Sequence, residues 1–275
     1  MRSPRSFPAF LLVITAIVAV SWIGTMPYAA NALDGATLAT QVYNRADGRD
    51  VTSRARMVLT EPGQSPRERL LYSYAADRKI RERWSLMRFV EPADVAGTGL
   101  LTVDYPGDEN DQWLYLPALD RVRRIASSRK GGRFVGSDFF YEDLRDREPE
   151  MDRHTLGGKS TVGNVPCTLL VSTPVDPDNS VYSKRVSCIH TGILVPLQIE
   201  YFEGRSDRPT KRLSAKRIKK IQGYWTVVDS EMEDLQSGHT TRLLIEAVKY
   251  DQGLPDNLFS RQALSDDRLE LRYRP

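Results

Sequence analysis

The chain has 275 residues, with 39 Lys and Arg side chains against 36 Asp and Glu. Without the first 32 residues, which carry two arginines and no acids, the balance falls to 37 against 36. A nearly neutral chain argues against nucleic acid as the main partner. Its length suits one large domain or two small ones.

Residues 1–32 are typical of a secretory signal peptide. Two early arginines precede an apolar run from Ala9 to Ile23, and Ala30-Asn31-Ala32 offers a small-x-small cleavage site. An uncleaved membrane anchor is the alternative, but the run is shorter than the ~20 apolar residues that a span needs. No cysteine follows the site, so acylation there is not expected. We expect residues 33–275 to be a single domain that works in the periplasm.

One helix and about eleven strands are predicted along the remaining chain. Leu33–Arg45 has helical periodicity, and Asp34 can cap it. After it the period changes to two, and short turns separate the apolar runs, which predicts antiparallel pairing. The predicted strands are Thr52–Thr60, Glu68–Ala75, Ile80–Phe89, Gly97–Tyr105, Gln112–Leu116, Val165–Ser172, Val181–Ile189, Leu194–Phe202, Arg212–Ile221, Tyr224–Glu233 and Thr240–Tyr250.

The stretch Arg121–Thr155 interrupts this strand pattern. It reads as a long irregular excursion with one helical turn near Asp138–Leu144, and a second helical piece is expected at Leu258–Leu264. So many strands with so little helix favour a mainly β fold, a strongly curved sheet folded around one or two helices. The concave interior of such a sheet suits a long apolar ligand.

The two cysteines, Cys167 and Cys188, predict a disulfide. Each lies in a predicted strand, and the turn-rich stretch from Pro174 to Ser180 lies between them. A hairpin there would bring the cysteines opposite one another, and export places them in an oxidising compartment. A redox or metal-binding thiol pair is the alternative, but no CxxC motif or paired histidines support it.

Motifs for catalysis, metals and cofactors are mostly absent. None of the three histidines has HExxH spacing, and no GxSxG motif occurs. Gly157–Thr161 mimics the end of a P-loop but lacks its opening glycine. The acidic turns Asp108–Asp111 and Asp176–Asp178 lack the spaced ligands of a calcium loop. We therefore expect no cofactor, no metal and no enzymatic activity, with an unrecognised hydrolase as the least favoured hypothesis.

Two basic stretches and one aromatic triplet are candidates for surface contacts. Arg208–Lys220 is equally well read as a solvated strand face, whereas Arg121–Arg133 is denser and lies in the excursion. The triplet from Phe139 to Tyr141 cannot face one core together, so at least one ring caps a cavity or meets a partner. The residues predicted to contact a partner or lipid headgroups are Arg121, Arg123, Arg124, Arg129, Lys130, Phe139, Phe140 and Tyr141.

Three stretches resemble signatures of the LolA-like outer membrane lipoprotein-sorting protein family. They are RFVEPADVAGT (Arg88–Thr98), WLYLPALDRVRRI (Trp113–Ile125) and GSDFFYEDL (Gly136–Leu144), and the likeness extends over roughly residues 35–265. The resemblance implies an open, incomplete antiparallel β-barrel with helices as a lid in its concave side. It implies a periplasmic carrier of lipoprotein or lipid acyl chains. For the lid-tethering arginine of that family, Arg54, Arg56 and Arg88 are the candidates.

The first functional hypothesis is therefore a monomeric lipid or lipoprotein carrier with transient membrane contact, which transfers its cargo toward the outer membrane. The alternative is a non-catalytic accessory module that docks onto a lipid-exporting inner-membrane transporter and carries no lipid. For the carrier, strand parity selects eight residues to line the cavity: Met57, Leu59, Met87, Phe89, Leu101, Val103, Trp113 and Tyr115.

Overall fold

The computed structural model describes residues 33–79, 81–107 and 110–275. The predicted signal peptide lies outside the described residues.

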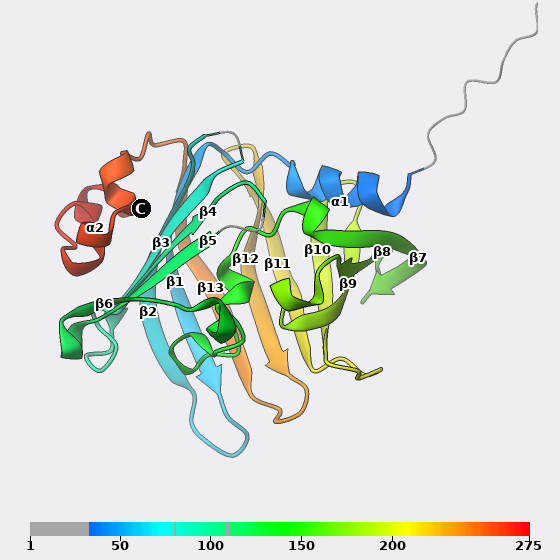
Figure 1. The fold of residues 1–275 in the computed structure, drawn as a ribbon, viewed down its shortest axis with the longest axis horizontal. Coiled ribbons are helices and arrows are strands. Elements are labelled where there is room, and N and C mark those ends of the chain that lie inside the picture. Colours follow the sequence, from blue (N-terminus) through cyan, green and yellow to red (C-terminus); the bar gives the residue numbers. More distant parts are fainter. Residues whose placement is uncertain (1–32, 80, 108–109) are drawn as a thin grey trace, which may run out of the picture. The chain divides into compact units, whose positions relative to one another are not determined.

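The described strands form one thirteen-stranded antiparallel sheet (Figure 1). Its order runs from β6 back through β5, β4, β3 and β2 to β1, and then from β13 back to β7. The two halves of the chain therefore meet where β1 pairs with β13. The strands are β1 Asp50–Thr60, β2 Arg67–Asp77, β3 Arg83–Glu91, β4 Gly99–Asp104, β5 Asn110–Leu116, β6 Arg121–Arg124, β7 Asp152–Val162, β8 Val165–Pro174, β9 Tyr182–His190, β10 Val195–Glu203, β11 Lys211–Ile221, β12 Tyr224–Asp234 and β13 Thr240–Tyr250.

Among the described residues, helices are few and short. The two described α-helices are α1, Gly35–Tyr43, and α2, Arg261–Ser265. The described 3-10 turns are η1 Pro117–Leu119, η2 Ser127–Arg129, η3 Phe134–Gly136, η4 Glu142–Leu144, η5 Pro149–Met151, η6 Pro177–Asn179, η7 Asp256–Phe259 and η8 Glu270–Tyr273. Within the described ranges, no helix combines the length and the apolar character that crossing a bilayer requires.

The sheet is rolled, with one concave face. The carbonyl of Tyr141 accepts a hydrogen bond of 3.0 Å from Gln112 on β5, whereas the next residue, Glu142, binds Arg185 on β9 at 2.5 Å. Nine strand spacings separate β5 from β9. At about 4.8 Å each, a flat sheet would hold these strands roughly 43 Å apart. The face that both contacts share must therefore be the inside of the curve, and we call it the inner face.

Two elements cover the inner face. Residues 133–148, which we call the inner segment, lie across it, and α1 packs against β7 and β8 beside them (Figure 1). Asp34 caps α1 by accepting a hydrogen bond of 2.7 Å from the Thr37 amide. Leu38 and Ala39 of α1 then pack on Leu170 and Ile189. The helix predicted over Leu33–Arg45 is confirmed as α1. The inner segment, in contrast, is irregular chain with short 3-10 turns and not a helical lid.

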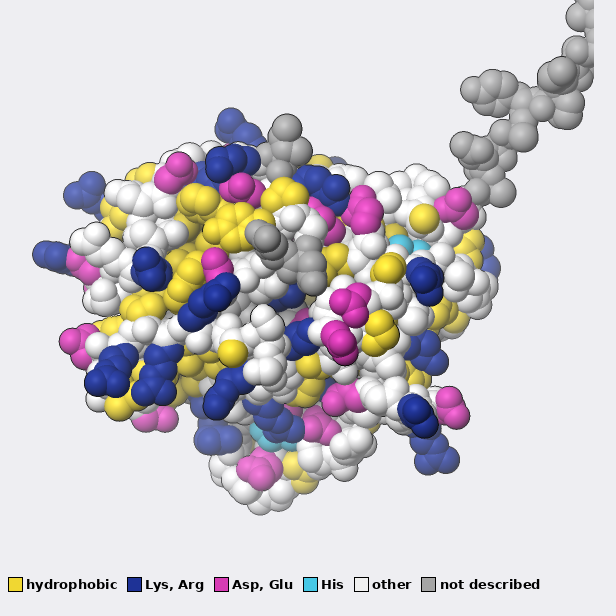
Figure 2. Space-filling view, viewed as in Figure 1, with side chains coloured by type: hydrophobic (Ala, Val, Ile, Leu, Met, Phe, Trp, Pro, Cys, Tyr) yellow, Lys and Arg dark blue, Asp and Glu magenta, His cyan; other side chains and the backbone are white. Residues whose placement is uncertain are grey.

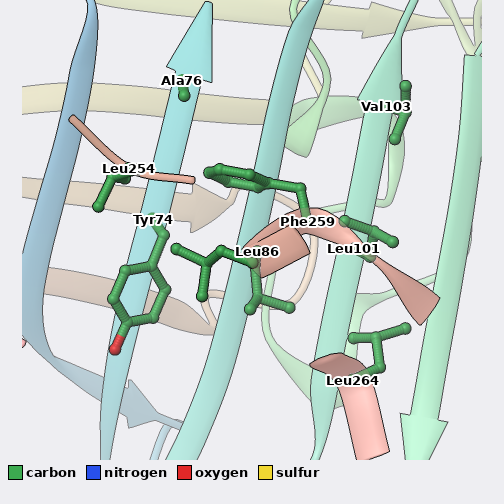
Figure 3. Close-up of a cluster of buried hydrophobic side chains, with 9 residues drawn as sticks. Tyr74, Ala76, Leu86, Leu101, Val103, Leu254, Phe259 and Leu264 are labelled. Carbon is green, nitrogen blue, oxygen red and sulfur yellow. The ribbon is translucent and has the colours of Figure 1, made fainter. Parts of the chain in front are cut away.

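The opposite, outer face is covered over β2–β4 by the C-terminal residues 254–275. Leu254, Leu258, Phe259 and Leu264 form one buried cluster with Tyr74, Ala76, Leu86, Leu101 and Val103 (Figure 3). The predicted C-terminal helical piece is present as η7 and α2. It packs on the outside of the sheet, whereas the LolA-like resemblance implied helices in the concave side.

The predicted disulfide joins Cys167 of β8 to Cys188 of β9, with Cα atoms 5.4 Å apart. Cys188 lies directly opposite Leu169, so the bridge runs diagonally between the strands. Both cysteines pack with Leu197 in a small buried cluster. The disulfide thus fixes the β8–β9 hairpin from the outer face, away from the inner segment.

Candidate functional site

An apolar surface lines the inner face over β1–β4 and β13. Its buried members pack as one cluster, together with Phe134 of the inner segment. The Phe134 ring lies 5.5 Å from the ring of Phe89 and 6.0 Å from that of Tyr141, so the inner segment shields this surface from water. The strand residues of the cluster are Ala55, Met57, Leu59, Leu71, Phe89 and Leu100, with Met87, Leu243 and Ile245 at its margin.

Three acids of the inner segment fasten it to the sheet, and Asp138 is the first. Its carboxylate pairs with His239 Nδ1 at 2.5 Å and accepts a hydrogen bond of 2.7 Å from the Thr241 hydroxyl. The Asp138 amide donates to the same hydroxyl at 2.9 Å. All three residues are buried. Asp138 therefore attaches the inner segment to the start of β13.

Glu142 is the second of these acids. It accepts hydrogen bonds of 2.5 Å from Arg185 and from the Ser180 hydroxyl, and one of 2.7 Å from the Val181 amide. A buried carboxylate needs such partners because an unpaired charge away from water is costly. Glu142 therefore attaches the inner segment to β9 and to the loop before it.

Asp143 is the third acid, and it pairs with a buried lysine. Lys211 Nζ on β11 lies 2.9 Å from the Asp143 carboxylate, which also accepts a hydrogen bond of 2.8 Å from the Tyr182 hydroxyl. The ammonium group sits 3.4 Å from the centre of the Phe140 ring. Burial lowers the pKa of Lys211, while Asp143 acts in the opposite direction. Two residues of the inner segment thus complete the surroundings of one sheet cation.

A cavity of about 290 Å³ lies between α1, the inner segment and β8–β10. Arg147 and Arg185 lie at its polar side and share the carboxylate of Asp152. His154 binds the Pro149 carbonyl at 2.8 Å and the Ser172 hydroxyl at 2.9 Å. The polar side is therefore internally paired. The apolar wall consists of Ala39, Val42, Leu170, Ile189, Pro196, Ile199 and Tyr201.

The eight predicted cavity residues do not share one face. Met57, Leu59, Met87 and Phe89 belong to the inner-face cluster. Leu101, Val103, Trp113 and Tyr115 lie on the outer face beneath the C-terminal residues. The physical reason is the β3–β4 register: Met87 pairs with Leu100, so odd residues on β3 share a face with even residues on β4. None of the eight lines the cavity beside α1.

The predicted contact residues divide in a similar way. Phe139 and Phe140 pack with Tyr182 and Tyr201. Tyr141 instead packs against the inner-face cluster that contains Phe134. The triplet therefore packs on two clusters, and none of its three rings is exposed. Lys130 is half-buried and donates to the Asp178 carbonyl. The exposed members of the set are Arg121, Arg123, Arg124 and Arg129.

The three candidate tethering arginines all lie on the outer face. Arg54 and Arg56 pair with Glu246 across the sheet surface. Arg88 is buried and donates to Glu270 at 2.9 Å and to the carbonyls of Ala263 and Leu264 at 2.7 and 2.9 Å. Arg88 therefore holds the C-terminal residues on the outer face. It makes none of these contacts with the inner segment.

Sequence patterns did not identify the sheet partners Arg185, Lys211 and His239. They lie 43, 68 and 101 residues from their acids, so only the rolled sheet brings them together. In the described part of the chain, no three His, Cys, Asp or Glu side chains are grouped so that they could hold a metal ion.

A model of a family of uncharacterized proteins matches residues 81–266. A DUF1329 family protein from Desulfovibrio piger is 31% identical, with a TM-score of 0.80 over 84% of this chain and 97% of that one. The chain belongs to the DUF1329 family. No curated protein matches it.

Two further solved structures relate this DUF1329 chain to the LolA-like fold. One, from Vibrio parahaemolyticus, is provisionally assigned as an outer membrane lipoprotein-sorting protein domain; it is 31% identical, with a TM-score of 0.79 over 84% of this chain and 98% of that one. The LolA superfamily protein NE2245 from Nitrosomonas europaea is 19% identical, with a TM-score of 0.67 over 84% of this chain and all of that one, and shows the fold alone. The resemblance seen in the sequence motifs is confirmed.

Proposed function

We propose that residues 33–275 form a periplasmic carrier that holds acyl chains of lipoproteins or lipids against the inner face and transfers them toward the outer membrane. The observation that carries the proposal is the way the inner apolar surface is covered. A segment that is not part of the sheet shields it, attached through Asp138, Glu142 and Asp143. Such a cover can leave without breaking any strand pairing.

Acyl-chain burial supplies the driving force in this proposal. Each CH₂ group moved from water to an apolar surface contributes about 0.8 kcal/mol. A chain of ordinary length can thus offset the loss of the contacts made by Phe134, Phe140 and Tyr141. The cargo shifts the equilibrium toward an open form because only that form exposes the inner face.

The cavity beside α1 is the proposed starting point of this exchange. At about 290 Å³ it lies near the lower end of the range for ligand pockets, ~300–1,000 Å³. Its apolar wall continues under α1 and toward the inner segment. Movement of the inner segment would enlarge the cavity into the surface around Met57 and Phe89. Binding of this kind needs no covalent chemistry.

The test is lipid mass spectrometry of protein recovered from a bacterial periplasm without detergent. The carrier proposal expects stoichiometric phospholipid or acylated peptide in the wild type. Ser187→Phe adds a ring at the cavity wall and should lower lipid content severalfold. The matched control is Val186→Phe. Val186 directly precedes Ser187 on β9, and its side chain lies on the opposite face of the sheet.

A folded wild-type protein that contains no lipid would overturn the carrier proposal. It would favour the accessory module that docks onto a lipid-exporting transporter. Equal lipid content in the Ser187→Phe and wild-type proteins would instead show that the cavity is not part of the cargo site.

A further inference from the structure

The edge strand β6 carries a cluster of exposed arginines. Arg121, Arg123 and Arg124 are exposed on it, and Arg129 is exposed in the following turn η2. Leu119, in the turn before the strand, is 52% exposed. Basic side chains stand beside hydrophobic ones at the left of Figure 2, the side where Figure 1 places β6. We call these five residues the β6 edge.

The strand register places these cations on both faces of the sheet margin. Arg121 and Arg123 lie opposite Leu116 and Leu114, which puts them on the inner face. Arg124 lies opposite Trp113 on the outer face. The partly buried Leu114 belongs to the inner-face cluster that the inner segment covers. The β6 edge therefore borders the covered apolar surface.

Most of these cations have no acidic partner. Arg124 binds Asp111 at 2.6 Å, but in the described ranges no ion pair involves Arg121, Arg123 or Arg129. The other basic strand, β11, is mixed. Its Lys211, Arg212 and Lys216 pair with acids on the inner segment and the neighbouring strands, whereas no ion pair in the described ranges involves Arg217, Lys219 or Lys220. Both strands thus carry unpaired cations, and the β6 edge differs in that it borders the covered apolar surface and includes the exposed Leu119.

We propose that the β6 edge docks the protein onto the anionic phospholipid headgroups of a membrane. Guanidinium groups bind phosphate oxygens in a bidentate manner, and closely spaced arginines add their attraction to an anionic surface. The exposed Leu119 can enter the headgroup boundary as such apolar side chains do. The docked protein presents the margin of its inner face to the bilayer. This surface role goes beyond the carrier proposal and does not depend on it.

Protection of the sheet edge is the alternative role for these arginines, because charged side chains discourage edge-to-edge pairing. That role requires no affinity for lipid. An extended acidic peptide that pairs with β6 is a different partner, and it would leave vesicle binding at the background level. The vesicle experiment separates both from membrane docking.

The experiment is co-sedimentation of the periplasmic protein with vesicles of phosphatidylcholine alone or mixed with phosphatidylglycerol. Wild type should bind only the mixed vesicles, less at high salt. Arg121→Ala combined with Arg123→Ala should lower that binding about 30-fold. The matched control is Arg217→Ala with Lys219→Ala, two exposed cations at the same spacing on β11.

Three results would overturn the proposal. The first is a wild-type protein that does not bind the mixed vesicles. The second is a β6 double variant that binds them as well as the wild type, and the third is an equal loss of vesicle binding in both double variants. Lipid content after detergent-free purification is measured on the same samples. A change in vesicle binding with unchanged lipid content separates docking from the proposed carrier function.

Discussion

Asp143 of the inner segment and Lys211 of β11 form an ion pair of 2.9 Å, and their side chains are only 4% and 3% exposed. The Phe140 ring from the same segment covers the ammonium group. Asp143 and Phe140 belong to one short stretch of chain, so their two contacts with Lys211 form and separate together. Opening the inner face would therefore leave the buried ammonium group of Lys211 without its carboxylate partner.

Removal of one partner of this pair should cost much more than removal of a surface pair. Asp143→Ala leaves Lys211 buried without a carboxylate, and we expect a loss of about 3–5 kcal/mol in the free energy of unfolding in urea. Asp143→Leu with Lys211→Met, an apolar pair of similar size, should recover most of it. The control is Arg56→Ala, whose exposed pair with Glu246 should change stability by about 0–1 kcal/mol.

The same variants report on the movement of the inner segment. Hydrogen exchange of the Phe134 and Tyr141 amides should accelerate in Asp143→Ala, while exchange in the β8–β9 hairpin stays unchanged. Equal exchange in variant and wild type would show that the Asp143–Lys211 pair does not hold the segment closed.

The outer face should respond independently of cargo. Leu264 is fully buried between the C-terminal residues and β4, so Leu264→Ala should lower the free energy of unfolding by about 2–5 kcal/mol. Lipid content per folded molecule should stay at the wild-type level. A loss of lipid in this variant would show that the C-terminal residues take part in holding the cargo.

The disulfide should contribute stability but not carrier function. It closes a loop with a sequence separation of 21 residues, for which the chain-entropy model gives about 3 kcal/mol. Cys167→Ser with Cys188→Ser should therefore shift urea unfolding by that amount. Lipid content measured well below the unfolding transition should not change, because the bridge lies on the outer face.

Asp104 should make the fold less stable as the pH rises from acid to neutral. Burial raises its pKa to about 6, against the opposing hydrogen bonds from Arg145 and the Asp146 amide. The pKa in the unfolded chain is about 3.9. Because the pKa of Asp104 is higher in the folded than in the unfolded chain, the protonated carboxyl stabilises the fold fully below about pH 4. This stabilisation is lost as the pH rises through 6.

The measurement is urea unfolding of the wild type and of Asp104→Asn across this pH interval. The wild-type free energy of unfolding should fall relative to that of the variant by on the order of 3 kcal/mol. Because the asparagine cannot ionise, the difference isolates Asp104 from other buried acids. Parallel curves for the two proteins would contradict the prediction.

The strands of this protein were predictable where one face is apolar and the connections are short. All eleven predicted strands are present. β6 and β7 were missed, because β6 is basic along its length and β7 is largely exposed and contains Gly157 and Gly158. Alternation marks a strand only when one of its faces is buried, and edge strands often lack such a face.

The candidate site was less predictable because it depends on register. Parity assigned Met87 and Leu101 to one face, but the chain between β3 and β4 sets a pairing in which they lie on opposite faces. Both faces of β4 are buried, so its sequence carries no alternation that would have revealed the change. The acids of GSDFFYEDL were visible as a motif, yet their partners on distant strands were not.

The pairing of β1 with β13 also bears on the order of folding. Met57 lies opposite Leu243, so the sheet cannot be joined until nearly the whole chain has been synthesised. Contacts of such long sequence separation form slowly, because a large loop must close first. Until then β1 remains an open edge, and both apolar faces of the first strands are unshielded.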